Sequence, residues 1–463
     1  MTGREPNRRL AEAIAQAGWT YDALARAVRG VAAENGELLQ INKSAVAHWV
    51  GGTQPSGPVT AFICEALSRR LGRAVTAAEA GFANGTSASA GATSWHADAV
   101  TSLADLGRLD VDLERRQVLA GSAYAAAALA LPHGDWWERT AHAARARQQD
   151  AGSGYTAGRG DVDAVRETTA FFSQMDQRHG GGHGRRALVL YLQSDVCTYL
   201  AGRFTSEQVR RDMFSAAGEL AYLAGWTAFD NAQHAVAQPY FTNAVKLAAM
   251  ADDPPMAAHV LRAMAHQALE LGHHQEALGL AAASVEGHRY RLATPREKAL
   301  LGVVHARALA ATGDSRAAAA ALLRAEDDLA GASPGIEEPH RVFFFGEASL
   351  AHETARTLAA AGDGKRAVAE FRRSVRTRNG AAFRRTHAVT LGLLGSIQAS
   401  GGAIEEACAT WTRALENMEG IRSGRTRQTV VDMRRALSPF RRRGVRLVSE
   451  LDTRAAEYLT RTI

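Results

Sequence analysis

Residues 353–371 read ETARTLAAAGDGKRAVAEF, two alanine-rich stretches separated by a short turn that contains two glycines. Alanine is the strongest helix former, and glycine ends helices because it adopts a positive φ without strain. The stretch therefore predicts two antiparallel helices joined by a tight turn. Its small residue Ala355 is followed twelve positions later by Ala367, then by Phe371 and Ser374. This spacing recurs along the chain and decides the fold.

The same order of residues occurs five times in register. Each occurrence has four positions: a small residue, an alanine twelve positions later, a usually larger residue four further on, and a small residue three beyond that. The five sets are Gly225, Ala237, Phe241 and Ala244; Ala265, Ala277, Ala281 and Ser284; Ala306, Ala318, Leu322 and Ala325; Ala355, Ala367, Phe371 and Ser374; Gly395, Ala407, Trp411 and Ala414. A generic alanine-rich bundle would not keep the offset through five occurrences. The pattern resembles the tetratricopeptide (TPR) repeat, in which small residues let two helices approach closely and the larger one packs against the next repeat.

The recurring alanines are 40, 41, 49 and 40 residues apart, whereas the standard repeat has about 34 residues. The difference predicts extended helices or turns, and an inserted loop at ASPGIEEPH, residues 332–340. We expect the hairpins to form a right-handed superhelix closed by a C-terminal helix.

Changes in composition divide the chain into parts. Residues 84–94, NGTSASAGATS, are small and polar without an apolar period, which is typical of a linker. The predicted parts are a helical domain at 1–83, a linker with an alanine-rich helix at 84–135, a helical segment at 136–217, five TPR-like hairpins at 218–418 and a basic C-terminal helix at 419–463.

The composition, 46% hydrophobic and 22% charged residues, is that of an ordinary soluble protein. Three widely separated cysteines imply no disulfide framework and fit a reducing compartment. Arg115 and Arg116 with the apolar run 118–131 imitate a twin-arginine export signal, but such a signal must be N-terminal. The run is also too short to span a bilayer. We expect a buried helix there and a cytoplasmic protein with no membrane partner.

The net charge of +6 is concentrated at the C-terminal end, where residues 420–463 hold eleven arginines and four acidic residues. This segment is either a solvated helix face or a surface for an acidic partner or nucleic acid.

The stretch INKSAVAHWVGGTQP, residues 41–55, predicts a short helix that begins after an Asn42 cap and ends at the glycine pair. Val46, Trp49 and Val50 share the face that must turn inward. The opposite face is small, polar and cationic, as a DNA major groove requires, and carries Lys43, Ser44, Ala47 and His48.

Two helices are expected before it, one from about Asn7 to Ala17 and one capped by Thr20. Thr20 and Tyr21, with Thr53 and Gln54 after the glycine turn, are predicted contacts to DNA phosphates that set the register.

Residues from SAVAHWVGGTQP to EALSRRLGRAVTAAEAGF resemble the Cro/repressor-like helix-turn-helix (XRE) family, except that the link between Ala25 and Lys43 is longer than its tight turn. The whole chain is similar to regulators of high-GC Gram-positive bacteria that join such a domain to TPRs; further matching motifs are MDQRHGGGHGRR (175–186) and residues 219–241. The resemblance implies an all-α fold, an N-terminal helix-turn-helix bundle followed by a TPR-type α-solenoid. It also implies a homodimeric transcriptional regulator of development or secondary metabolism that binds double-stranded DNA.

The alternative function is a scaffold without DNA binding, in which both parts dock proteins. No pattern for a catalytic site, a cofactor or a metal is found: His179 and His183 in HGGGHGRR lack further ligands. That loop is predicted to be an interhelix turn, with anion binding by Arg185 and Arg186 as the alternative. His273 and His274 are expected to be solvated in the turn of the second repeat.

Three consecutive aromatic residues, Phe343, Phe344 and Phe345, cannot all point into one helix–helix core. We expect at least one to be exposed on the inner surface of the repeats, where it would contact a peptide, small molecule or protein ligand. The alternative is burial against the loop 332–340.

Overall fold

The computed structural model describes residues 5–35, 37–82, 94–111, 124–132, 134–150, 154–443 and 446–461. The chain forms two compact units. The first comprises Met1–Val165, Arg186–Gly225 and Gln233–Leu280, and the second comprises Arg166–Arg185, Trp226–Ala232 and Ala281–Ile463. Arg115, Arg116 and all of the predicted linker except Ser94 lie outside the described residues.

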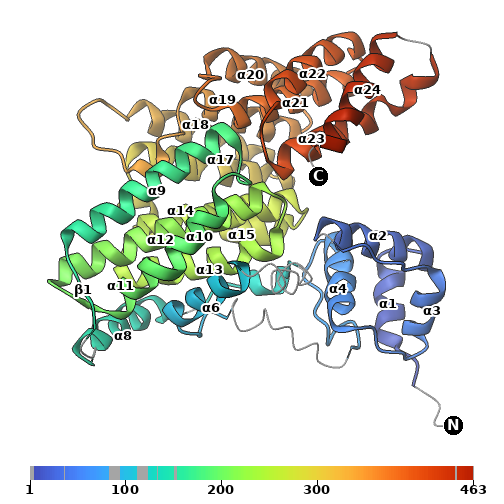
Figure 1. Cartoon of the computed structure of the whole chain (residues 1–463). Coiled ribbons are helices and arrows are strands. Elements are labelled where there is room, and N and C mark those ends of the chain that lie inside the picture. Colours follow the sequence, from blue (N-terminus) through green and yellow to red (C-terminus); the bar gives the residue numbers. More distant parts are fainter. Residues whose placement is uncertain are drawn as a thin grey trace. The chain divides into compact units, whose positions relative to one another are not determined.

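The N-terminal part of the first unit is a bundle of four helices (Figure 1), namely α1 (Arg8–Gln16), α2 (Tyr21–Glu34), α3 (Lys43–Val50) and α4 (Gly57–Leu71). The predicted caps form, because the Thr20 hydroxyl accepts a hydrogen bond from the Ala23 amide at 3.2 Å. Asn42 caps α3 in the same way. Buried apolar residues from Leu10 to Phe82 form one core inside the bundle.

The segment between the bundle and the hairpins is helical with one small sheet. It contains α6 (Ala99–Val111), η1 (Ala126–Leu129), α8 (Trp136–Asp150), α9 (Arg159–His179), α10 (Arg185–Tyr191), the π-helical turn η2 (Leu192–Val196) and α11 (Cys197–Ala201). Strands β1 (Thr156–Ala157) and β2 (Arg203–Phe204) pair in parallel. The helix predicted over 118–131 is wrong where the structure describes it, since only the four-residue 3-10 helix η1 forms there.

All five predicted hairpins form (Figure 1). Their helix pairs are α12 (Glu207–Asp230) with α13 (His234–Ala251), α14 (Pro254–Glu270) with α15 (His274–Ser284), α17 (Pro295–Ala311) with α18 (Ser315–Ala330), α19 (Glu347–Ala360) with α20 (Gly364–Thr377), and α21 (Arg384–Ser400) with α22 (Ile404–Met418). Shorter elements are α16 (Gly287–Arg291), η3 (His340–Val342) and η4 (Ser438–Arg443), and the chain closes with α23 (Gly424–Leu437) and α24 (Arg446–Arg461). The fold is therefore all-α, as predicted, with a four-helix bundle followed by helical hairpins that pack in the manner of a solenoid.

The recurring small and large residues pack together as the repeat pattern requires. A Cβ added to Gly395 would lie 2.5 Å from Nε1 of Trp411, so only glycine fits opposite this indole. Phe371 packs on Ala355 of its own hairpin and on Leu394 of the next. The prediction that the larger residue reaches the neighbouring repeat is thus confirmed at Phe371, which also contacts its own hairpin.

The described part of the chain contains no helix that is long and apolar enough to cross a membrane.

Candidate functional site

The outer face of α3 has the helical phase that the sequence predicts. Lys43, Ser44, Ala47 and His48 are exposed, whereas Val46 is fully buried and Trp49 is 7% exposed. No acidic side chain lies on α3, so Lys43 gives its outer face a positive charge.

The first turn of α3 is fixed by its cap. The Asn42 Oδ1 accepts hydrogen bonds from the amides of Ser44 and Ala45 at 3.0 and 3.1 Å. Asn42 is itself exposed, so its side-chain NH₂ group lies at this end of the helix. Capping therefore orients both the backbone and the polar end of α3.

The link before α3 is the departure from a tight helix-turn-helix. It spans residues 35–42, and the Arg29 guanidinium donates to the Ile41 carbonyl at its end. Leu39 packs on the bundle core, whereas Leu38 is 91% exposed. The longer link is thus held to the bundle by Leu39 and by the Ile41 carbonyl, and α3 still packs against α2.

The predicted phosphate contacts lie on the surface of the same bundle. Thr20 is exposed at the N-terminus of α2 and Tyr21 is 38% exposed beside it. The Thr53 amide donates to the His48 carbonyl at 2.9 Å, which folds the chain back over the end of α3, and Gln54 is exposed. Their contacts with DNA stay a prediction.

His273 is not solvated, contrary to the sequence-based expectation, although His274 is exposed. The His273 Nε2 lies 2.8 Å from Oε1 of Glu65 on α4, and both side chains are almost completely buried. The Tyr124 ring stacks on His273 with centroids 5.5 Å apart. Burial raises the pKa of the Tyr124 hydroxyl well above its usual value, so the phenol is neutral. This polar group attaches α4 to the turn between α14 and α15.

The loop HGGGHG is an interhelix turn between α9 and α10, as predicted. The Gly181 amide donates to an Asp230 carboxylate oxygen at 2.9 Å, and the Gly182 amide to the Arg422 carbonyl at 3.0 Å. A Cβ on Gly181 would lie 2.5 Å from the Thr227 carbonyl oxygen. The glycines therefore serve close packing of backbones.

The histidine and arginine side chains near this loop lie in different surroundings. The rings of His179 and His183 are 5.6 Å apart, and no group of three metal-ligating side chains occurs in the described residues. Arg185 is buried while Arg186 is exposed, so the two do not share one surface.

A buried charged cluster brings two motifs that are far apart in the sequence into contact. Arg385 donates to Asp176 at 2.9 Å and also to Asp230, and all three side chains are at most 2% exposed. Asp176 belongs to the stretch 175–186 and Asp230 to the stretch 219–241. Burial, partly opposed by Arg385, raises the pKa of the Asp176 carboxyl to about 6.

The three phenylalanines lie in the turn between η3 and α19, which begins at Glu347, and the prediction that at least one is exposed is wrong. Phe345 is buried, whereas Phe343 and Phe344 are half-buried. The Phe343 ring stacks on His340 at 4.9 Å, so the end of the inserted loop covers part of it. The predicted burial against this loop thus applies to one face of Phe343.

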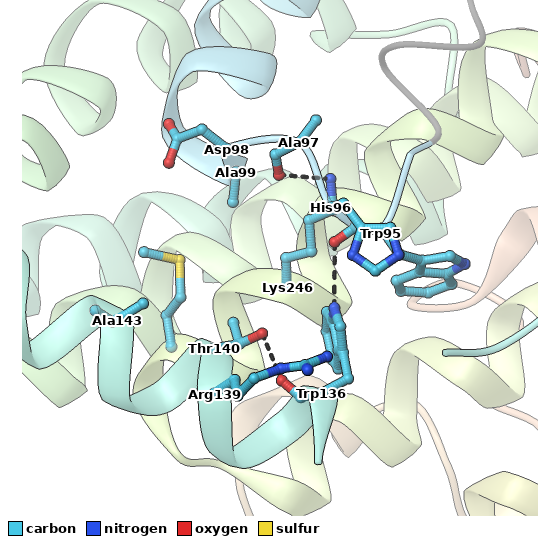
Figure 2. Close-up of a pocket in the computed structure, with 12 residues that line it drawn as sticks. Trp95, His96, Ala97, Asp98, Ala99, Trp136, Arg139, Thr140, Ala143 and Lys246 are labelled. Carbon is cyan, nitrogen blue, oxygen red and sulfur yellow. Dashed lines mark hydrogen bonds between the residues drawn. The ribbon is translucent and has the colours of Figure 1, made fainter. Parts of the chain in front are cut away.

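Sequence reasoning missed a cavity of about 490 Å³ in the first unit (Figure 2). Trp95 and Ala97 lie on one side of it, Trp136 and Arg139 of α8 on another, and Lys246 of α13 at its wall. The available signal was Lys246 itself, one of four lysines in the chain, within a helix that has no acidic residue.

The N-terminal part of the chain is similar to a known family. Residues 10–83 match the family model of the SP15 N-terminal domain, which corresponds to the four-helix bundle and the segment after it. No curated protein matches the chain.

Proposed function

We propose that the protein is a sequence-specific DNA-binding transcriptional regulator whose recognition helix is α3. The observation that carries this proposal is the two-sided packing of α3: a small, polar, cationic outer face is exposed, while Val46 and Trp49 fix the helix in the bundle core. A capped helix of eight residues with such a face has the size and chemistry that a major groove accepts.

Each outward residue has a role in this proposal. Lys43 donates to guanine or to a phosphate, Ser44 donates to either, and His48 contacts the groove edge. Ala47 permits close approach or contacts a thymine methyl group. Thr20, Tyr21, Thr53, Gln54 and the Asn42 amide position the bundle on the backbone.

A regulator of this class acts as a homodimer in the cytoplasm. Two copies of α3 would then read half-sites about one helical turn apart. The hairpins act as the sensor or dimerisation part, and control of development or secondary metabolism is the process that the resemblance suggests. Half-exposed Phe343 and Phe344 are the proposed contacts for a peptide or protein ligand of this part.

The test is selection of bound fragments from the genomic DNA of the source organism, followed by a mobility-shift titration at several salt concentrations. If Lys43 reads a base, Lys43→Ala should weaken binding by about 1–3 kcal/mol, and the loss should depend on one operator position. If Lys43 contacts a phosphate, the variant should reduce the slope of log affinity against log salt concentration by about one unit. Trp49→Ala should instead destabilise the bundle by about 3–5 kcal/mol.

The matched control for the double variant Lys43→Ala, His48→Ala is Lys365→Ala, His274→Ala, which removes an exposed lysine and an exposed histidine elsewhere. The control should bind DNA normally. If the first double variant binds selected fragments as tightly as the unaltered protein, α3 is not the recognition helix. Absence of any enriched fragment at low salt would favour the scaffold function.

A further inference from the structure

The cavity in Figure 2 is bounded by three parts of the first unit. The segment Trp95–Ala99 ends at the start of α6, α8 contributes Trp136 and Arg139, and α13 contributes Lys246. Its volume of about 490 Å³ lies within the range of small-molecule sites, about 300–1,000 Å³. Neither the α3 surface nor the three phenylalanines belong to it.

Lys246 is an unusual residue for its place in the fold. The residue is 2% exposed, and its Nζ donates to the Ala97 carbonyl at 3.2 Å. An ammonium group has three donors, and a buried cation is costly unless an anion accompanies it. Asp98 supplies part of that charge, but the Asp98 carboxylate also caps α6 by accepting from the Thr101 amide at 2.8 Å.

A second donor lines the cavity. The Trp95 Nε1 is buried and has no hydrogen-bond partner among the described residues. An unpartnered buried N–H is costly and rare, so a ligand acceptor is the expected partner. By contrast, the Trp136 Nε1 donates to the Trp95 carbonyl at 3.2 Å, which holds the two tryptophans together.

Flat apolar surface accompanies these donors. The Trp95 and Trp136 rings meet edge to face with centroids 5.6 Å apart, and both line the cavity with Ala143 and Met250. The Arg139 guanidinium is exposed at the same wall and pairs with Asp135 at 3.1 Å. The cavity thus combines aromatic walls with a buried ammonium and an indole N–H.

We propose that this cavity binds a small organic monoanion, a carboxylate on a flat apolar body. The carboxylate accepts hydrogen bonds from Lys246 Nζ and Trp95 Nε1, and the apolar body lies against the two indoles. Because the exposed Arg139 is already paired with Asp135, the buried Lys246 and one indole N–H match the charge and acceptors of a carboxylate. The inference stands independently of DNA binding.

The experiment is isothermal titration calorimetry on the full chain at pH 7 without DNA. The probe is 1-naphthoate, and its neutral analogue 1-naphthamide has nearly the same shape. We expect the acid to bind at least about tenfold more tightly than the amide, because only the acid forms a charge-assisted hydrogen bond with Lys246. Equal affinity of acid and amide, or no binding of naphthoate at millimolar concentration, would overturn the proposal.

Two variants locate the site. Lys246→Met keeps most of the unbranched side chain and removes its charge, and should weaken naphthoate at least about tenfold without lowering the melting temperature. Trp95→Phe keeps an aromatic wall, loses the N–H and should weaken naphthoate several-fold. Lys365→Met is the matched control at an exposed lysine and should leave affinity unchanged. Unchanged affinity in folded Lys246→Met would contradict the assignment.

Discussion

Replacing Arg385 by methionine should be among the most damaging single changes in the second unit. Arg385 lies between Asp176 and Asp230, and the three side chains are at most 2% exposed. Methionine replaces only the aliphatic part of the arginine side chain and has no charge. The variant therefore leaves two buried carboxylates close together without their common counterion.

The magnitude follows from this geometry. Removing one partner of a buried ion pair costs about 3–5 kcal/mol, because the remaining charge is uncompensated. In a unit of roughly 200 residues, each kcal/mol lowers the melting temperature by about 2–4 °C, so the transition should fall by about 6–20 °C. Protonation of Asp176, whose pKa is already raised to about 6, would relieve part of this loss in acid.

Asp176→Asn is the informative comparison. In this variant Asp230 still pairs with Arg385 and only one buried carboxylate remains, so stability should change by at most about 1 kcal/mol. Asp230→Asn should cost more, because Asp230 also accepts from the Gly181 amide at 2.9 Å. Arg366→Met removes an arginine that is 79% exposed and should leave the transition unchanged.

The assay is differential scanning calorimetry of the full chain at pH 7, with circular dichroism to confirm that each variant is helical before heating. A cost below about 1 kcal/mol for Arg385→Met, or an equal cost for Asp176→Asn and Arg385→Met, would contradict this prediction. Either result would mean that Arg385 is not the main counterion of the two carboxylates.

Two further predictions concern packing and pH. Gly395→Ala should destabilise the last hairpin by about 1–3 kcal/mol in thermal unfolding, since its Cβ would lie 2.5 Å from Trp411 Nε1; an unchanged transition would show that Trp411 moves freely. Burial lowers the pKa of Lys246 to about 8. The naphthoate affinity measured by calorimetry should therefore be constant near pH 7 and fall as pH rises through 8, because Lys246 loses its charge. A pH-independent affinity up to pH 10 would exclude Lys246 as the binding cation.

Local patterns were enough to predict the hairpins and the orientation of α3. Helical periodicity places Val46 and Trp49 on one face and Lys43 and His48 on the other, and this phase is independent of what packs outside the bundle. The Thr20 and Asn42 caps are equally local, since each side chain bonds amides within three residues. The DNA contacts of these residues remain a prediction.

Tertiary structure alone decided where isolated polar and small residues act. The sequence placed His273 in a turn, where solvation is the usual expectation, but a turn becomes buried when another element covers it, as α4 does through Glu65. Gly181 lies in a turn, yet its lack of a side chain matters because Thr227 approaches it from another helix. No local pattern encodes such contacts.

The sequence by itself determined the all-α class, the five hairpins and the two faces of α3, because helix periods and turn residues act over a few positions. Only the tertiary structure placed Arg385 between Asp176 and Asp230, and Lys246 beside Trp95, which are about 150 or more residues apart in the chain. The physical reason is that burial and charge compensation depend on which distant surfaces meet, and a single sequence records the residues without their partners.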